Sequence, residues 1–368
     1  MARLTRAQQQ ERTRAAVLAA AREEFAGHGY AEAKVDRIAE RAELTRGAVY
    51  SNFPSKRALY LAVLVDMVGR STAGEVSPAS PASTGEALGA FARVWLERLP
   101  LADDTPAGGH LQLRSLSGVL DDEPARAALA QILRFEALLL ALALEGHRPH
   151  HAEQTRRVRL AELVLTLLHG SGGFAETAPG FGDPFDVTRA CEHLAGIDLT
   201  DSWDPPHLPY VVPARPSDEP WTPPTEPPDQ LTGRRVDLAA DGVIVVLGTN
   251  RLAAAEEAVR AARPGEQVTV VIVTSDPAEI GRLVRLRIGD LTACLQRVFA
   301  AGAWPLRLVF DDRAVMAAAL GPRDPGDATE VAVRIQDGTI VARADGRGAG
   351  HAAAAADVPG TRSRGAGA

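Results

Sequence analysis

The residues with the clearest chemical purpose lie in one short stretch, residues 35–56, which reads VDRIAERAELTRGAVYSNFPSK. Arg46 has the side chain best shaped for a bidentate grip on a guanine edge or a phosphate. Tyr50, Asn52 and Lys56 follow it closely, and each can donate a hydrogen bond to a phosphate oxygen. This combination of residue types predicts contact with nucleic acid.

These side chains can act together only if two short helices and a turn hold them. Ile38 points a first helix inward, Leu44 fills the turn, and Val49 seats a second helix against the first. Thr45 is placed to cap the second helix, and Gly47 lets its backbone approach DNA closely. The pattern predicts a helix-turn-helix, although periodicity alone equally allows an ordinary pair of alanine-rich helices.

The distribution of charge agrees with a DNA-binding end. The chain of 368 residues has a net charge of −7, yet residues 1–60 hold eleven Lys/Arg against seven Asp/Glu, a net +4 that leaves −11 for the remainder. A basic segment on an acidic body suits a protein that touches phosphate with one end. The polar N-terminus and the absence of a long apolar run indicate a cytoplasmic protein without a membrane partner.

A longer motif extends this stretch on both sides. Its elements are Phe25, Gly29-Tyr30, Val35-x-x-Ile38-Ala39-x-x-Ala42 and Leu44-Thr45-x-Gly47-x-x-Tyr50-x-Asn52-Phe53-x-x-Lys56-x-x-Leu59. With this motif, residues 12–59 resemble the N-terminal domain of TetR-family regulators. The DNA-binding residues that the resemblance implies are Lys34, Thr45, Arg46, Gly47, Ala48, Tyr50, Ser51, Asn52 and Lys56. Lys34 and Asn52 replace the more usual Thr and His, and both keep a hydrogen-bond donor.

Residues 59–202 fit the second domain of that family, a helical bundle that binds a ligand and dimerises. We expect helices over 84–99, 109–120, 123–145, 151–168 and 184–195. The last two resemble the pair that forms the homodimer bundle in relatives, although a monomeric core is the alternative. The candidate contacts for an unknown small-molecule ligand are Phe91, Trp95, His110, Arg114 and Phe135. Ordinary core or surface roles are the competing explanation for each of these five residues.

Composition changes after residue 202. Ten prolines between residues 205 and 228 predict an extended linker over 203–230. Apolar runs at 243–247, 268–273, 306–310, 331–335 and 339–342 predict strands, and Asp337-Gly338 predicts a hairpin between the last two. We therefore expect an α/β domain over 231–356 and a disordered tail over 357–368.

The order of these elements weakly resembles a thioredoxin-like fold, with residues 232–248 as its opening strand, turn and first core strand. Thiol chemistry in that fold needs a cysteine after the first core strand, but residues 248–256 read GTNRLAAAE. A nucleotide-binding or flavodoxin-like domain is the alternative, although neither GxGxxG nor GxxxxGK[ST] follows a core strand. Cys294 falls among apolar residues, which favours a buried thiol.

The sequence as a whole predicts a multidomain protein. The expected fold is a TetR-like all-α region, with a helix-turn-helix over 1–58, followed by a small α/β domain that weakly resembles a thioredoxin-like fold. The expected function is a ligand-responsive dimeric repressor that binds a pseudo-palindromic double-stranded DNA operator. We expect no catalytic residue and no cofactor. We also expect no metal site, because the histidines near residue 150 lack carboxylates at ligand spacing. The alternative is a redox-related or partner-binding protein whose C-terminal domain carries the main activity.

Overall fold

The computed structural model describes residues 5–71, 81–98, 116, 118–146, 155–178, 180–299, 304–321 and 324–356. The chain forms two compact units, and each is assembled from separate stretches. Unit 1 consists of Met1–Leu129, Leu160–Leu199 and Ala278–Ala300, and unit 2 of Ala130–Arg159, Thr200–Pro277 and Ala301–Ala368. The expected domain boundaries follow chain order, whereas the two units do not. The predicted tail over 357–368 lies outside the described residues.

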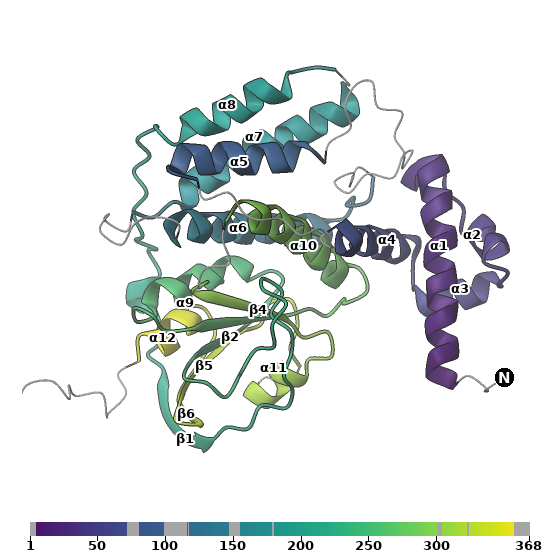
Figure 1. Cartoon of the computed structure of the whole chain (residues 1–368). Helices are drawn as coiled ribbons and strands as arrows, with labels where there is room; N and C mark the ends of the chain where they lie inside the picture. The colour runs from purple at the N-terminus through teal and green to yellow at the C-terminus, as the bar shows by residue number, and fades with distance from the viewer. Residues whose placement is uncertain are drawn as a thin grey trace, which may run out of the picture. The chain divides into compact units, whose positions relative to one another are not determined.

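Unit 1 begins with four helices, visible at the N-terminal end of the chain in Figure 1: α1 (Arg6–Glu32), α2 (Val35–Arg41), α3 (Arg46–Asn52) and α4 (Lys56–Ser71). The backbone of α1 is not helical at Gly29, which has a φ of 68°. Only glycine takes this left-handed conformation at little cost. Gly27, two residues earlier, is helical and has no positive φ.

The rest of unit 1 is also helical. It contains α5 (Thr84–Leu96), most of α7 (Val158–Thr177), α8 (Pro184–Leu194) and α10 (Ile280–Val298). Asp183 caps α8 by accepting the amide of Phe185 at 2.8 Å, with Pro184 in the first turn. The predicted helix over 109–120 lies largely outside the described residues, and residues 118–120 are not helical.

The long apolar helix predicted over 123–145 is α6 (Glu123–Gly146), and Asp122 caps it through the amide of Ala125 at 2.8 Å. By length and composition α6 could cross a membrane, but 67% of its apolar window is buried inside the protein. Buried core helices of soluble proteins have the same composition, so α6 is weak evidence for a membrane span.

The sheet of unit 2 has six strands in the order β1-β6-β5-β2-β3-β4. They are β1 (Arg215–Pro220), β2 (Gly242–Gly248), β3 (Val268–Val273), β4 (Leu306–Phe310), β5 (Glu330–Gln336) and β6 (Thr339–Asp345). The neighbours β2–β3 and β3–β4 are parallel, and the pairs β2–β5, β5–β6 and β1–β6 are antiparallel. The predicted C-terminal α/β domain is confirmed, and its sheet is mixed.

Local sequence accounts for the central strands and the hairpin. β2 and β3 are buried at every residue, as expected for β-branched runs that are covered on both faces. Asp337 and Gly338 have φ values of 49° and 69°, the positive pair that a tight hairpin turn requires. The turn fixes the register of β5 and β6, in which Gln336 pairs with Thr339.

The proline-rich segment expected as a linker contains a strand. Residues 215–220 form β1, the edge strand of the sheet, which pairs with β6. An edge strand tolerates Pro216 and Pro220 because a missing amide proton there can face solvent. The opening strand expected near residue 232 is absent, since residues 232–238 form only an isolated bridge between Pro228 and Arg235.

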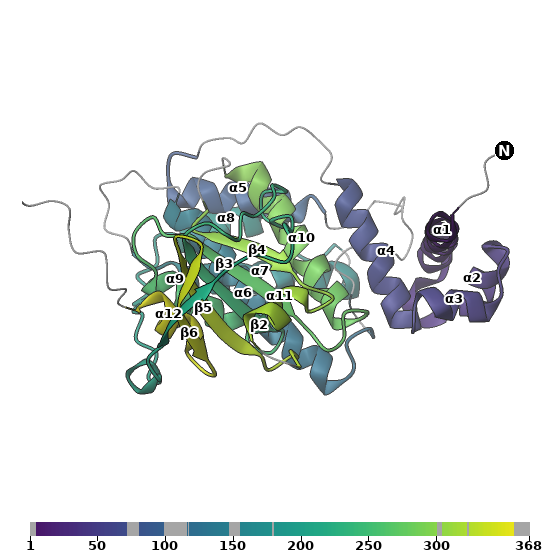
Figure 2. The same ribbon diagram turned by 90° about the horizontal axis from the view of Figure 1, so that it is seen from below.

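Helices and a loop cover the two faces of the sheet (Figures 1 and 2). α9 (Ala255–Ala261) and α12 (Ala349–Ala354) lie side by side on one face. On the other face, α11 (Val315–Leu320) and the segment around Trp221 close a core that includes Val246, Val271 and Val333. The indole nitrogen of Trp221 donates to the carbonyl of Leu238 at 2.8 Å, which anchors this segment.

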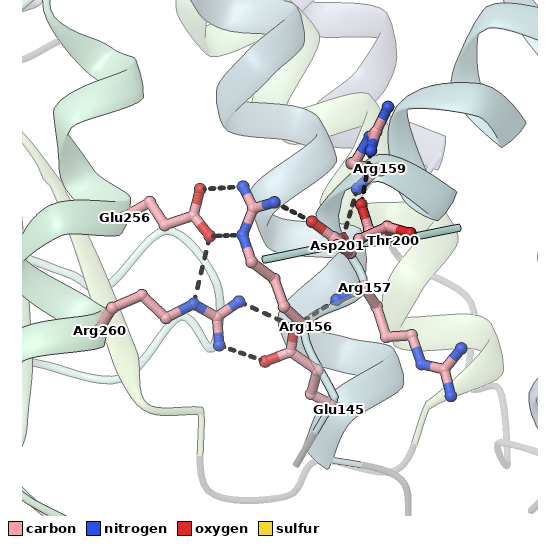
Figure 3. Close-up of polar contacts among 8 residues, drawn as sticks. All are labelled: Glu145, Arg156, Arg157, Arg159, Thr200, Asp201, Glu256 and Arg260. Carbon is pink, nitrogen blue, oxygen red and sulfur yellow. Dashed lines mark hydrogen bonds and ion pairs between the residues drawn. The ribbon is translucent and has the colours of Figure 1, made fainter. Parts of the chain in front are cut away.

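A network of buried charges joins α9 to residues around the end of α6, as Figure 3 shows. Arg156 donates to both oxygens of Glu256 at 2.7 and 2.8 Å and also pairs with Asp201. Arg260 donates to both oxygens of Glu145 at 2.6 and 2.8 Å and to Glu256 at 3.2 Å. Burial works to lower the pKa of Arg156, but its hydrogen bonds to Glu256 and the charge of Asp201 raise it.

Replacing Glu256 with Gln should therefore destabilise unit 2 by about 1–3 kcal/mol, because two partly buried guanidinium groups lose a shared acceptor. The urea midpoint of the full chain, followed by circular dichroism, measures the effect. Glu192→Gln is the matched control, because its pair with Arg93 at 3.3 Å is exposed and should contribute less than about 1 kcal/mol. Equal midpoint shifts for the two variants would show that the network adds nothing beyond a surface pair.

Candidate nucleic-acid interface

The helix-turn-helix forms as the sequence predicts. Ile38 and Val49, at 0% and 1% exposure, face each other's helices, and Leu44 closes the turn by donating its amide to the carbonyl of Ala39 at 2.9 Å. Glu43 has a φ of 55° in this turn. The side chain of Thr45 accepts the amide of Ala48 at 3.2 Å, so the expected N-cap of α3 is confirmed.

One side of α3 is open to solvent. The exposed residues at its start and along its outer face are Thr45, Arg46, Gly47, Tyr50 and Ser51, while Ala48 and Asn52 are half-buried. A β-carbon added at Gly47 would have only the Thr45 hydroxyl within 4 Å, at 3.9 Å, so the backbone is accessible there. Seven of the predicted DNA-binding residues are thus brought together on one short helix and its cap.

Arg46 is held by its neighbours on this surface. Its guanidinium donates to both oxygens of Asp36 at 3.3 Å and lies over the ring of Tyr50, 5.5 Å from the centroid. The contact with Tyr50 and then the charge of Asp36 raise the pKa of Arg46. Arginine is always protonated at neutral pH, so the raised pKa does not change the charge of Arg46. The two contacts instead hold its side chain on the outer face of α3.

The other predicted phosphate contacts have different surroundings. Asn52 donates to the carbonyl of Ala48 at 2.9 Å. The ammonium group of Lys56 donates to the carbonyl of Ala31 at 2.9 Å and lies 4.9 Å from the centre of the Tyr30 ring. Burial lowers the pKa of Lys56. Lys34 is exposed at the N-cap of α2, so α2 and the turn after it separate this residue from α3 in the chain.

A buried carboxylate supports this surface from behind, and the sequence pattern did not single it out. Glu24 of α1 is fully buried, accepts the backbone amide of Lys34 at 3.1 Å and pairs with Arg37 of α2 at 3.2 Å. Burial of an acid is costly unless it is paired, so these contacts fix α2 against α1. Only the placement of Glu24 opposite two arginines in the folded chain reveals this role.

The structure describes three of the five candidate ligand contacts. Phe91 and Trp95 are buried on α5 with their rings 5.8 Å apart, and Trp95 packs edge-on against His169 of α7 at 5.1 Å. Phe135 is buried on the part of α6 that belongs to unit 2. His110 and Arg114 lie outside the described residues. Phe91 and Trp95 are therefore packed with other side chains of unit 1, whereas Phe135 belongs to unit 2.

In unit 2 the ends of two parallel strands carry a polar cluster. Asp327 accepts hydrogen bonds from the hydroxyl groups of Thr249 and Thr274 at 2.7 and 2.6 Å, and from Ser275. Burial tends to raise the pKa of Asp327, but these hydrogen bonds outweigh it and hold the pKa below its usual value. Residues 249–256, which follow β2, contain no cysteine. Cys294 is buried in α10.

A cavity of about 410 Å³ lies elsewhere in unit 2. Leu208, Val341 and Ala352 give it an apolar lining, and His351 is the imidazole on its wall. Burial, and then the proximity of His207, lower the pKa of His351. The volume of this cavity falls in the range of small-molecule sites. No sequence motif pointed to this cavity, because its walls come from segments more than a hundred residues apart.

Comparison with known proteins agrees with the geometry of the N-terminal segment. Residues 17–63 match the model of the family described as bacterial regulatory proteins of the tetR family. This segment contains α2, α3 and the start of α4, together with the predicted DNA-binding residues. Residues 17–63 of this chain are thus similar to the DNA-binding segment of bacterial regulatory proteins of the tetR family. A comparison with curated proteins gives no match.

Solved structures align over about half of the chain. A transcriptional regulator from Streptomyces coelicolor is 27% identical, with 50% of this chain and 94% of that chain covered and a TM-score of 0.26. FadR from Bacillus subtilis, solved with stearoyl-CoA, is 16% identical, with coverages of 50% and 99% and a TM-score of 0.32. FadR from Bacillus halodurans is 16% identical, with coverages of 50% and 93% and a TM-score of 0.27.

The Asp36–Arg46 pair leads to a prediction. Asp36→Asn should strengthen DNA binding by up to about fivefold, because an exposed carboxylate no longer competes with phosphate or a guanine edge for Arg46. Fluorescence anisotropy with a labelled duplex at two salt concentrations measures the change. Asp36→Glu keeps the charge and should bind like the wild type. Weaker binding by Asp36→Asn would instead mean that Asp36 aligns Arg46 for recognition.

Proposed function

We propose that this protein is a dimeric, ligand-responsive repressor that reads a pseudo-palindromic operator with α3. The observation that carries the proposal is the open face of α3, where Arg46, Gly47 and Ser51 lie together beside a capped helix N-terminus. A helix of this kind fits the major groove, and its first turn reaches the base edges. We assign base contacts to Arg46, Gly47, Ala48 and Ser51.

We assign phosphate contacts to Lys34, Tyr50, Asn52 and Lys56, with Thr45 fixing the start of the helix. Lys56 would exchange its bond with the Ala31 carbonyl for a phosphate, a change that favours the charged form of the amine. The cytoplasm is the expected location, because the operator is there.

The proposal of a homodimer draws support from an exposed apolar surface on α7 and α8. Phe181 and Phe185 are 70% and 78% exposed, and Phe174 stacks near Phe181 with ring centroids 5.2 Å apart. Leu163 and Ile197 are also exposed on this helix pair and its end. Aromatic side chains are costly to leave in water, so a second copy of this surface is the natural cover. To reach successive major grooves, the two α3 helices of such a dimer must lie about 34–36 Å apart.

Ligand response belongs to the proposal through the resemblance of residues 59–202 to the second domain of the family. A small molecule would lower operator affinity only as far as it prefers the state that does not bind DNA. We keep Phe91, Trp95, His110, Arg114 and Phe135 as the candidate contacts for such a molecule, with substitution and ligand titration as their test.

We also propose a thioredoxin-like fold for the sheet of unit 2. The parallel pair β2–β3 and the antiparallel hairpin β5–β6 beside it support this proposal. Thr249 and Asp327 stand where the redox chemistry would require a thiol. A regulator is therefore favoured over the redox alternative. Peroxidase or disulfide reductase turnover by the full chain that survives Cys294→Ser would contradict this.

The recognition helix can be tested with a duplex that the full chain selects from random DNA. Arg46→Ala should weaken binding to this duplex by about tenfold to a hundredfold, and binding to random DNA much less, because a base contact is lost. Titration by fluorescence anisotropy measures both affinities.

Lys56→Ala is the matched comparison, since a phosphate contact carries no sequence information. It should weaken binding to both duplexes alike and reduce the slope of log K against log salt by about one unit per protomer. If neither substitution changes either affinity, α3 is not the recognition helix.

The proposed dimer surface leads to a separate prediction. Phe185→Asp should raise the dissociation constant of the dimer by at least about tenfold, because a charge replaces an aromatic side chain that the dimer would bury. Sedimentation equilibrium measures this constant. Tyr210→Asp, at an 86% exposed aromatic residue outside α7 and α8, is the control and should leave it unchanged. A monomeric wild type, or equal effects of both variants, would contradict the surface.

A further inference from the structure

The helix α10 lies between β3 and β4 in the chain, yet it packs with the DNA-binding helices of unit 1. It lies beside α4 and α5, as Figures 1 and 2 show. Most of its residues are buried, including Leu283, Leu286 and Leu291. A segment that the sequence places in the C-terminal α/β region is therefore part of the helical unit that carries α3.

The N-terminal end of α10 contacts the start of α4 through ions and hydrogen bonds. The Glu279 carboxylate accepts from the hydroxyl of Ser55 and from Nε of Arg57. Arg57 also pairs with Asp122, the cap of α6. The side chains of Arg57 and Glu279 are only 23% and 15% exposed. Because both groups are largely withdrawn from water, loss of one would leave its partner poorly compensated.

A second contact reaches the end of the recognition helix itself. Phe53 is the C-cap of α3 and is fully buried. The guanidinium of Arg282 from α10 lies over its ring at 5.2 Å, and that of Arg14 from α1 lies over it at 4.8 Å. Arg282 also donates to the carbonyl of Ala58 at 2.8 Å. One arginine of α10 thus touches both the cap of α3 and the first turn of α4.

The two helices also approach closely farther along. A β-carbon added at Gly289 of α10 would lie 3.3 Å from Cγ1 of Val68 on α4, so glycine permits this separation. Asp290, the next residue, pairs with Arg98, just beyond the end of α5. α10 is therefore fixed to α4 at both ends of their contact and is tied to the α5 side by an independent ion pair.

We propose that Glu279 and Arg282 of α10 are positioning residues for DNA recognition. They fix the start of α4 and the C-cap of α3, and so set the orientation in which α3 is presented to the major groove. The inference rests on the proposed function and deepens it, because it names residues far from the helix-turn-helix in the chain that orient α3. Positioning matters because base contacts require closer geometry than phosphate contacts do.

The test compares Glu279→Gln and Arg282→Met with Asp290→Asn in the full-length protein. Asp290 is the matched control, because it is a buried acid on the same helix whose arginine partner lies near α5 rather than α4. Glu279→Gln and Arg282→Met should lower the ratio of selected-duplex to random-duplex affinity by about 2- to 30-fold. Asp290→Asn should leave that ratio unchanged. Circular dichroism confirms that each variant is folded.

A second readout without DNA keeps the inference separate from the proposed function. Hydrogen exchange of backbone amides in residues 46–58 should be faster in Glu279→Gln and Arg282→Met than in the wild type and Asp290→Asn. Glu279→Asp, which keeps the charge, should restore much of the protection. Unchanged exchange in residues 46–58 would overturn the inference. If exchange responds but the wild type prefers no DNA sequence, the proposed function fails while the bracing by α10 stands.

Discussion

A helix that is buried on nearly every side must be surrounded by other elements before it is stable, and α10 is such a helix. Its partners in unit 1 include α4, which continues directly from the recognition helix, and α5. The burial of Leu283, Leu286 and Leu291 provides apolar stabilisation, while the Glu279–Arg57 contact fixes the direction of approach. The helix α10 lies late in the chain, yet for this reason it belongs to the same unit as the DNA-binding helices.

The ends of β2 and β3 carry a polar cluster that is satisfied internally. Asp327 and three hydroxyl-bearing residues satisfy one another there by hydrogen bonds. The loop that holds Asp327 also passes so close to Gly248 that a β-carbon there would overlap the Asp327 carbonyl. The end of the sheet is therefore closed by its own polar groups, and the helix that leaves it, α10, contributes to the helical unit instead.

Sequence reasoning found the features that depend on local chemistry. The β-branched run at 268–273, the Asp337-Gly338 turn and the Thr45 cap were all confirmed, because each is decided by residues adjacent in the chain. Sequence reasoning was wrong where the structure depends on contacts between segments far apart in the chain. The prolines of 215–220 indicated a linker, yet β6 offers them an edge on which to pair. Likewise, the place of α10 against α4 and the buried role of Glu24 arise only when segments far apart meet.

The central claim is that α3 presents a sequence-reading face to DNA, in a protein with two such faces. Selection of bound duplexes from random DNA by the full-length wild-type protein, followed by sequencing, tests it most directly. The account predicts enrichment of a two-fold symmetric site whose half-sites are about 34–36 Å, or one helical turn, apart. If the protein retains DNA in a way that depends only on salt and enriches no sequence, the account is contradicted. Attraction to the phosphates would then explain all of the binding.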